Sequence, residues 1–118
     1  MGEAADTSEI DIDPGRVADW RTREPQLQLI DVREPSEREA GHIAGSRHIA
    51  LGELSSLAPT VAREQPVVFY CRVGARSEMA AQAFRTAGYE AYSMRGGLVR
   101  WVGDGRPLEP EGGYVADH

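Results

Sequence analysis

Residues 67–77 read VVFYCRVGARS, and this stretch decides the fold. Its first four residues are a continuous run of β-branched and aromatic side chains, which is typical of a strand buried on both faces. From Ser77 onward, apolar residues recur at helical spacing as far as Ala87, and Gly88 follows as a helix-ending glycine. Cys71 therefore stands where a strand ends and a helix is about to begin, which is where α/β sheets place their reactive groups.

Strand and helix signals alternate on both sides of this stretch. Further short strands are expected near residues 10–12, 27–32, 47–50 and 91–94. Helical segments are expected from Asp13-Pro14 to before Pro25, and over 34–41, 51–57 and 97–101. The alternation predicts an α/β domain with a mostly parallel central sheet of about five strands, flanked by helices on both faces. The domain is expected to span residues 10–107, between a loose N-terminal segment at 1–9 and a loose acidic tail at 108–118.

Composition narrows the class of function. The 118 residues suit one domain, and 41% apolar with 27% charged residues is ordinary for a soluble globular protein. The net charge of -6 argues against nucleic acid or an anionic membrane as a partner. The chain has no apolar run of membrane-spanning length and no leader pattern, so a cytoplasmic protein is expected. All 13 basic residues are arginine, which excludes a Schiff-base lysine.

The chemistry is predicted to lie in the loop that Cys71, the only cysteine, opens. A short loop that enters a helix N-terminus can turn its amides inward, and the helix dipole adds positive potential. Gly74 permits a tight turn, and Arg72 and Arg76 add two positive charges. A lone cysteine is more often a buried structural side chain, but these neighbours favour a thiolate nucleophile held in an anion pocket.

Three segments together resemble the single-domain rhodanese-like sulfurtransferase family. The first is IDVREPSE at residues 30–37, followed by GHIAGS at 41–46. The second is YCRVGARS at 70–77, and the third is RGGL at 95–98 with Trp101. The resemblance covers roughly residues 10–107, and it implies that this region is a rhodanese-like domain.

This resemblance implies a mechanism. The Cys71 thiolate would take sulfur from a small anionic donor, either thiosulfate or a persulfide, and pass it to a thiol, cyanide or protein acceptor. The residues that would bind the anion are those of the loop: Arg72, Val73, Gly74, Ala75, Arg76 and Ser77. Its two arginines would steer the donor toward Cys71. Asp31 and Arg33 resemble the family's buried polar pair, which would support the loop, and Glu37 could join it. No metal or organic cofactor is implied.

Three alternatives remain beside this interpretation. A phosphatase or arsenate reductase of similar fold would need five residues between its cysteine and arginine, whereas four separate Cys71 from Arg76. A non-catalytic binding module usually lacks the cysteine, although a sulfur-relay role is compatible with it. A Cys–His hydrolase would use His42 or His48, which are more simply structural or surface residues. Arg95 either faces the mouth of the pocket or is a solvated charge.

Overall fold

The computed structural model describes residues 9–117. The segment predicted to be loose at 1–9 lies outside this range except for Glu9, as does residue 118. Within the range, no helix combines the length and the apolar character that crossing a bilayer requires.

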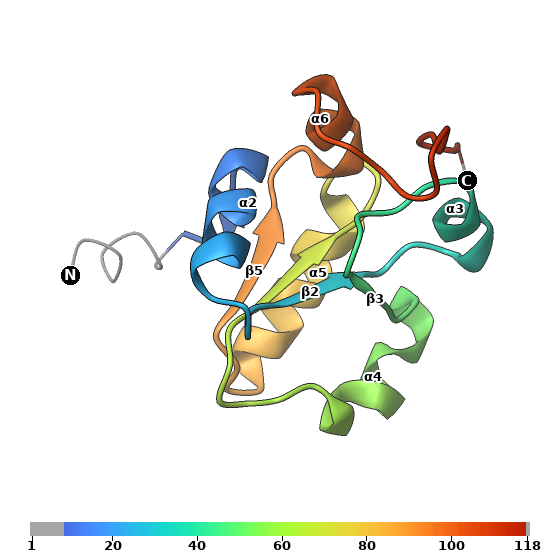
Figure 1. Ribbon diagram of the computed structural model, residues 1–118. Helices are drawn as coiled ribbons and strands as arrows, with labels where there is room; N and C mark the ends of the chain where they lie inside the picture. Colours follow the sequence, from blue (N-terminus) through green and yellow to red (C-terminus); the bar gives the residue numbers. More distant parts are fainter. Residues whose placement is uncertain (1–8, 118) are drawn as a thin grey trace.

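A five-stranded sheet forms the centre of the molecule (Figure 1). Its strands are β1 (Asp11–Ile12), β2 (Gln28–Asp31), β3 (Arg47–His48), β4 (Val67–Tyr70) and β5 (Ala91–Met94). Their order is β1-β5-β4-β2-β3, and every pair is parallel. All five carboxyl ends therefore meet at one edge of the sheet, with β4 in the central position. The predicted α/β class and strand number are confirmed.

Helices cover both faces of this sheet, as predicted. Alternate residues of β4 point to opposite faces, so Phe69 packs with α4 (Leu54–Leu57) and α5 (Ala75–Thr86). Val68 and Tyr70 pack on the other face, with α2 (Pro14–Arg23) and α6 (Gly97–Gly103). The short helix α3 (Pro35–Ala40) follows β2, and the 3₁₀ turns η1 (Leu51–Glu53) and η2 (Ala58–Thr60) flank α4. Two cores explain why the β4 run is apolar at every position.

Helix α5 begins two residues earlier than the sequence indicated. The prediction placed its start at Ser77, but Ala75 is its first helical residue. Gly74 precedes it with a φ of 114°, a left-handed conformation that glycine adopts without strain. Because of this turn, Ala75 and Arg76 are helical, and their amides belong to the first turn of α5 rather than to the loop before it.

The C-terminal segment differs from the loose tail expected at 108–118. Glu109 and His42 exchange two backbone hydrogen bonds of 2.8 and 2.9 Å in an antiparallel bridge. Further along, the Tyr114 N–H donates to the Ala40 carbonyl at 2.9 Å. The red end of the chain accordingly lies beside α3 in Figure 1. The segment is held by hydrogen bonds to backbone groups at and just after the end of α3, which its own Gly- and Pro-rich composition does not indicate.

Candidate active site

Cys71 lies at the carboxyl end of β4 with only 1% of its surface exposed. Its Sγ accepts hydrogen bonds from the Gly74 N–H at 3.1 Å and the Ser77 N–H at 3.4 Å. The Ser77 Oγ lies 3.5 Å from the same sulfur. Two main-chain donors aimed at one sulfur stabilise negative charge on it, as the anion-pocket prediction requires.

The loop around Cys71 is closed by the N-terminus of α6. The Leu98 N–H donates to the Cys71 carbonyl at 2.9 Å, and the Val99 N–H donates to the Arg72 carbonyl at 3.0 Å. Gly97, which directly precedes Leu98, has a φ of 61°, and a Cβ there would stand 2.4 Å from the Arg72 oxygen. The sequence analysis predicted a helical segment over 97–101 but missed the contact of its first turn with the loop at 71–77.

A buried hydroxyl pair supports the loop from beneath. The Ser77 Oγ donates to the Gly74 carbonyl at 3.2 Å and lies 2.7 Å from the Ser93 Oγ on β5. Both serines are fully buried. Ser93 was not among the predicted site residues, and its only signal in the sequence is a polar residue inside the otherwise apolar strand at 91–94.

Arg76 is bound to a carboxylate of α3. Its Nη1 and Nη2 lie 2.8 and 3.0 Å from the two oxygens of Glu37, whose side chain is fully buried. Burial alone would raise the pKa of Glu37, but hydrogen bonds from Arg76 and from the Glu34 N–H lower it. The hydrogen bond to Glu37 raises the pKa of Arg76, and the nearby charge of Cys71 adds to this. The sequence analysis suggested that Glu37 could join the Asp31–Arg33 pair, whereas its hydrogen bonds go to the loop arginine Arg76 and to the Glu34 N–H.

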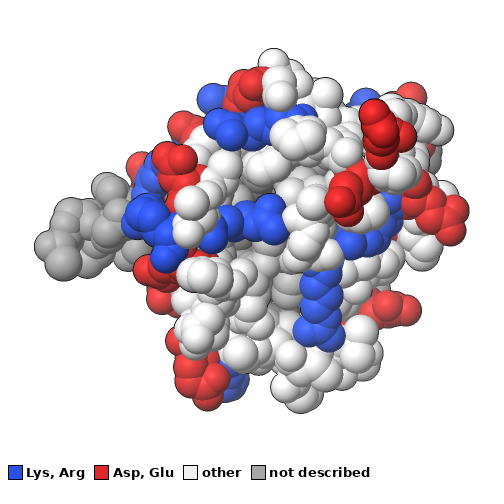
Figure 2. Space-filling model, viewed as in Figure 1, with Lys and Arg blue, Asp and Glu red and all other residues white. Residues whose placement is uncertain are grey.

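Arg72 also has an acidic partner. Its Nη2 lies 2.9 Å from the Oδ1 of Asp117, a side chain that is 88% exposed. Figure 2 shows blue and red side chains next to one another over the viewed face, without a broad field of either sign. Both loop arginines are therefore paired, so the loop carries less free positive charge than the sequence indicated.

The predicted supporting pair lies beside the site. Asp31 and Arg33 are both fully buried, and their side chains form two hydrogen bonds, of 2.8 and 2.7 Å. Burial alone would lower the pKa of Arg33, but the hydrogen bond and charge of Asp31 raise it. Arg33 also donates to the Gly41 carbonyl at 2.8 Å, which joins the end of β2 to the end of α3. The pair therefore holds α3, the helix that carries Glu37, against the sheet.

The remaining candidates make no hydrogen bond to the sulfur among those of residues 9–117. Arg95 lines a hollow of about 200 Å³ together with the loop residues Val73, Gly74 and Ala75. The ring of His42 contacts the Arg38 carbonyl at 3.2 Å, and the ring of His48 contacts the Arg33 carbonyl at 2.7 Å. The hydrogen bonds of the two rings thus go to main-chain carbonyls, which supports their structural interpretation over a Cys–His hydrolase.

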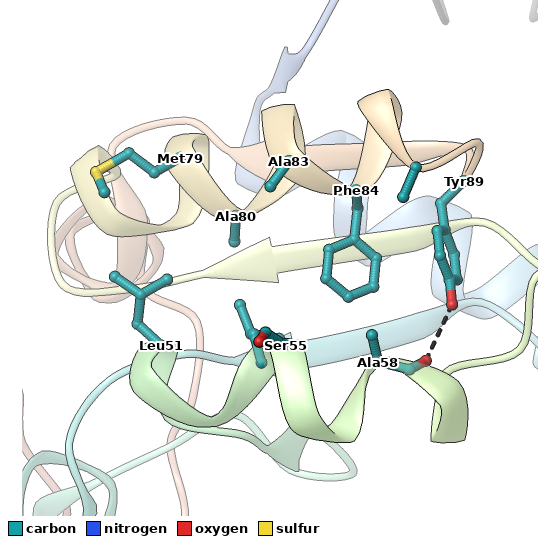
Figure 3. A pocket seen from close by; sticks show the side chains of 10 residues that line it. Leu51, Ser55, Ala58, Met79, Ala80, Ala83, Phe84 and Tyr89 are labelled. Atoms are coloured by element: carbon teal, nitrogen blue, oxygen red, sulfur yellow. Dashed lines mark hydrogen bonds between the residues drawn. The ribbon is translucent and has the colours of Figure 1, made fainter.

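An apolar groove of about 420 Å³ lies between α4 and α5 (Figure 3). Met79 and Leu51 flank one end of the groove in this view, and Tyr89 flanks the other. The Tyr89 hydroxyl donates to the Ala58 carbonyl at 2.9 Å, so it is already engaged. The lining is completed by Leu54, Ser55, Ala80, Ala83, Phe84 and Ala87.

Comparisons with known proteins agree with this geometry. The protein-family model described as "Rhodanese-like domain" matches residues 13–104. The chain is 42% identical over 86 residues to the uncharacterized protein YqhL of Bacillus subtilis, covering 72% of this chain and 68% of that protein. It is 33% identical over 82 residues to the putative sulfurtransferase YtwF of the same species, covering 70% and 80%. The crystal structure of a rhodanese-related protein from Thermoplasma volcanium matches with a TM-score of 0.74 and 28% identity, over 83% of this chain and 95% of that chain.

Proposed function

The chain belongs to the rhodanese-like domain family, and on this basis we propose that it is a sulfurtransferase whose Cys71 carries sulfur as a persulfide. The observation that carries the proposal is the pair of main-chain N–H groups, from Gly74 and Ser77, that point at the Cys71 sulfur. A relative named as a putative sulfurtransferase supports the same reaction class. We place the reaction in the cytoplasm, where a single thiol stays reduced.

The first half-reaction loads the enzyme. The Cys71 thiolate attacks the outer sulfur of the donor, so a new S–S bond forms as the donor's own bond breaks. With thiosulfate, sulfite leaves with the electron pair of the broken bond. In the second half-reaction, an acceptor thiolate attacks the terminal sulfur and releases the Cys71 thiolate. Every electron pair is accounted for between donor, enzyme and acceptor.

The loop suits a persulfide because separate N–H donors are available for its inner and its outer sulfur. The N–H groups of Gly74 and Ser77 hold the inner sulfur. Ala75 and Arg76 form the first turn of α5, where backbone N–H groups have no carbonyl four residues earlier to bind. These two amides are the donors that we assign to the charged outer sulfur, in the manner of an oxyanion hole.

Intact-mass measurement tests the proposal directly. The folded protein is incubated with thiosulfate, or with an organic persulfide, and its mass is recorded before and after addition of a thiol. We expect a gain of one sulfur atom that the thiol removes and that Cys71→Ser abolishes. Circular dichroism of the variant shows that its fold is retained. The proposal fails if the folded wild-type protein gains no sulfur from either donor.

The same experiment separates the alternatives. A phosphatase or arsenate reductase would need an arginine free to bind an oxyanion, whereas the Arg76 guanidinium is engaged by Glu37 through both terminal nitrogens. Turnover of an aryl phosphate without sulfur uptake would nevertheless favour that class. A protein that neither gains sulfur nor hydrolyses the phosphate would be a binding module.

A further inference from the structure

Arg72 follows the reactive cysteine directly, and its guanidinium is only partly used. Its Nη2 donates to the Asp117 Oδ1 at 2.9 Å. Within residues 9–117, its Nε is buried and has no hydrogen-bond partner. Arginine binds carboxylates and related oxyanions best through two parallel hydrogen bonds. The contact with Asp117 therefore leaves the Nε–H of Arg72 without an acceptor, which a bidentate anion would supply.

Asp117 reaches Arg72 because the C-terminal segment is fixed by its backbone. The paired hydrogen bonds between Glu109 and His42 hold the segment's start, and the Tyr114 N–H bond to Ala40 holds it three residues before Asp117. The Tyr114 backbone also packs closely on Gly41, where a Cβ would stand 2.7 Å from the Tyr114 oxygen. The carboxylate is thus delivered to Arg72 by contacts independent of the ion pair.

We propose that Asp117 is a specificity-determining residue, whose carboxylate occupies the anion position on Arg72 and disfavours dianionic sulfur donors such as thiosulfate. The favoured donors are persulfides of uncharged organic groups, whose single negative charge lies on the transferred sulfur, where the loop amides can hold it without a cation. This inference rests on the proposed sulfurtransferase function. The second loop arginine, Arg76, is bound to Glu37, so it does not replace Arg72 as a cation for the donor.

The test compares two donors across matched variants. Asp117→Asn removes the negative charge that lies beside Arg72. Glu111→Gln removes an equal charge from an exposed position in the same segment. The rate constant for loading Cys71 is measured with thiosulfate and with the persulfide of 2-mercaptoethanol. Because exposed ion pairs are weak, Asp117→Asn should raise the thiosulfate constant by about two- to fivefold at low salt. The 2-mercaptoethanol persulfide carries one negative charge rather than two, so its constant should respond less to Asp117→Asn. Glu111→Gln should leave both constants unchanged.

Two further measurements make the inference falsifiable. The gain from Asp117→Asn should shrink as salt is added, and it should vanish when Arg72→Ala is combined with it in a double-mutant cycle. Equal thiosulfate constants for Asp117→Asn and Glu111→Gln would overturn the inference, as would a gain that persists without Arg72. In both cases sulfur uptake itself remains, so the proposed function stands. Uptake from neither donor would remove both proposals together.

Discussion

Gly97 lies against the main chain of Arg72 so closely that a Cβ at position 97 would stand 2.4 Å from the Arg72 carbonyl oxygen. Real Cβ atoms do not approach backbone oxygens to this distance, so any side chain at 97 would push α6 away from the reactive loop. The Leu98 and Val99 amides that bind the carbonyls of Cys71 and Arg72 would move with it.

Gly97→Ala is therefore expected to lower both stability and sulfur loading. Gly105→Ala is the matched control, because Gly105 also has a positive φ, of 84°, but nothing lies within 4 Å of its added Cβ. In the control, the free energy of unfolding should fall only by the cost of placing a non-glycine residue at positive φ, about 1–2 kcal/mol. Urea unfolding and the loading rate are measured for both. Equal losses in the two variants would contradict the close contact.

Asp31→Asn is expected to be strongly destabilising. It leaves the fully buried Arg33 guanidinium without its charged partner, and breaking such a pair costs about 3–5 kcal/mol. Arg100→Gln serves as the control, because Arg100 lies 3.7 Å from Asp13 in a pair whose side chains are each 46% exposed. Such a surface pair contributes about 0–1 kcal/mol. Comparable urea midpoints for the two variants would refute the structural role of Asp31.

Glu37 should make the protein sensitive to acid. Its pKa is lowered in the folded state, so the unfolded chain takes up the proton first as the pH falls. The free energy of unfolding should thus decline as the pH drops below about 4.3, the ordinary value for glutamate, toward the lowered folded value. Urea unfolding at several acid pH values measures this slope.

Glu37→Gln should flatten that slope and lower stability at pH 7 by about 1.5–3 kcal/mol, because charge-assisted hydrogen bonds to Arg76 are lost. Glu64→Gln, at an exposed position, should keep the wild-type slope. An unchanged acid slope in Glu37→Gln would show that another group dominates the transition.

Ser77 and Ser93 should be energetically coupled. Replacing either with alanine leaves a buried hydroxyl without its 2.7 Å partner, which costs about 1–3 kcal/mol. The double variant should lose less than the sum of the single losses, with a coupling of about 0.5–3 kcal/mol. Ser77→Ala should also slow sulfur loading more than Ser93→Ala, because the Ser77 hydroxyl lies 3.5 Å from the Cys71 sulfur. Strict additivity would argue against the hydroxyl pair.

Local patterns were sufficient for most elements and for the position of Cys71 at the carboxyl end of β4. The apolar run at 67–70 predicted a strand buried on both faces, and two separate cores confirm it. The glycine at 74 indicated a tight turn, although its left-handed conformation starts α5 earlier than the apolar spacing suggested. These features depend on neighbours within a few residues, which is the range that sequence periodicity reports.

Long-range partners could not be predicted in the same way. Glu37 and Asp117 bind the two loop arginines from 39 and 45 residues away. Nothing in the local pattern indicates that either carboxylate pairs with a loop arginine. The sequence therefore indicated two free cations, whereas the fold supplies each with an anion. The order of the strands, which places β1 beside β5, is likewise a tertiary property.

The closure of the reactive loop by α6 also has a consequence for how the protein is made. Synthesis produces β4 and Cys71 before the Leu98 and Val99 amides that bind the loop carbonyls. A nascent chain that has not yet reached α6 consequently contains Cys71 without the two hydrogen bonds that α6 donates to the loop carbonyls. The loop therefore gains these hydrogen bonds only after residues 98 and 99 have been made, so completion of the site coincides with completion of the domain.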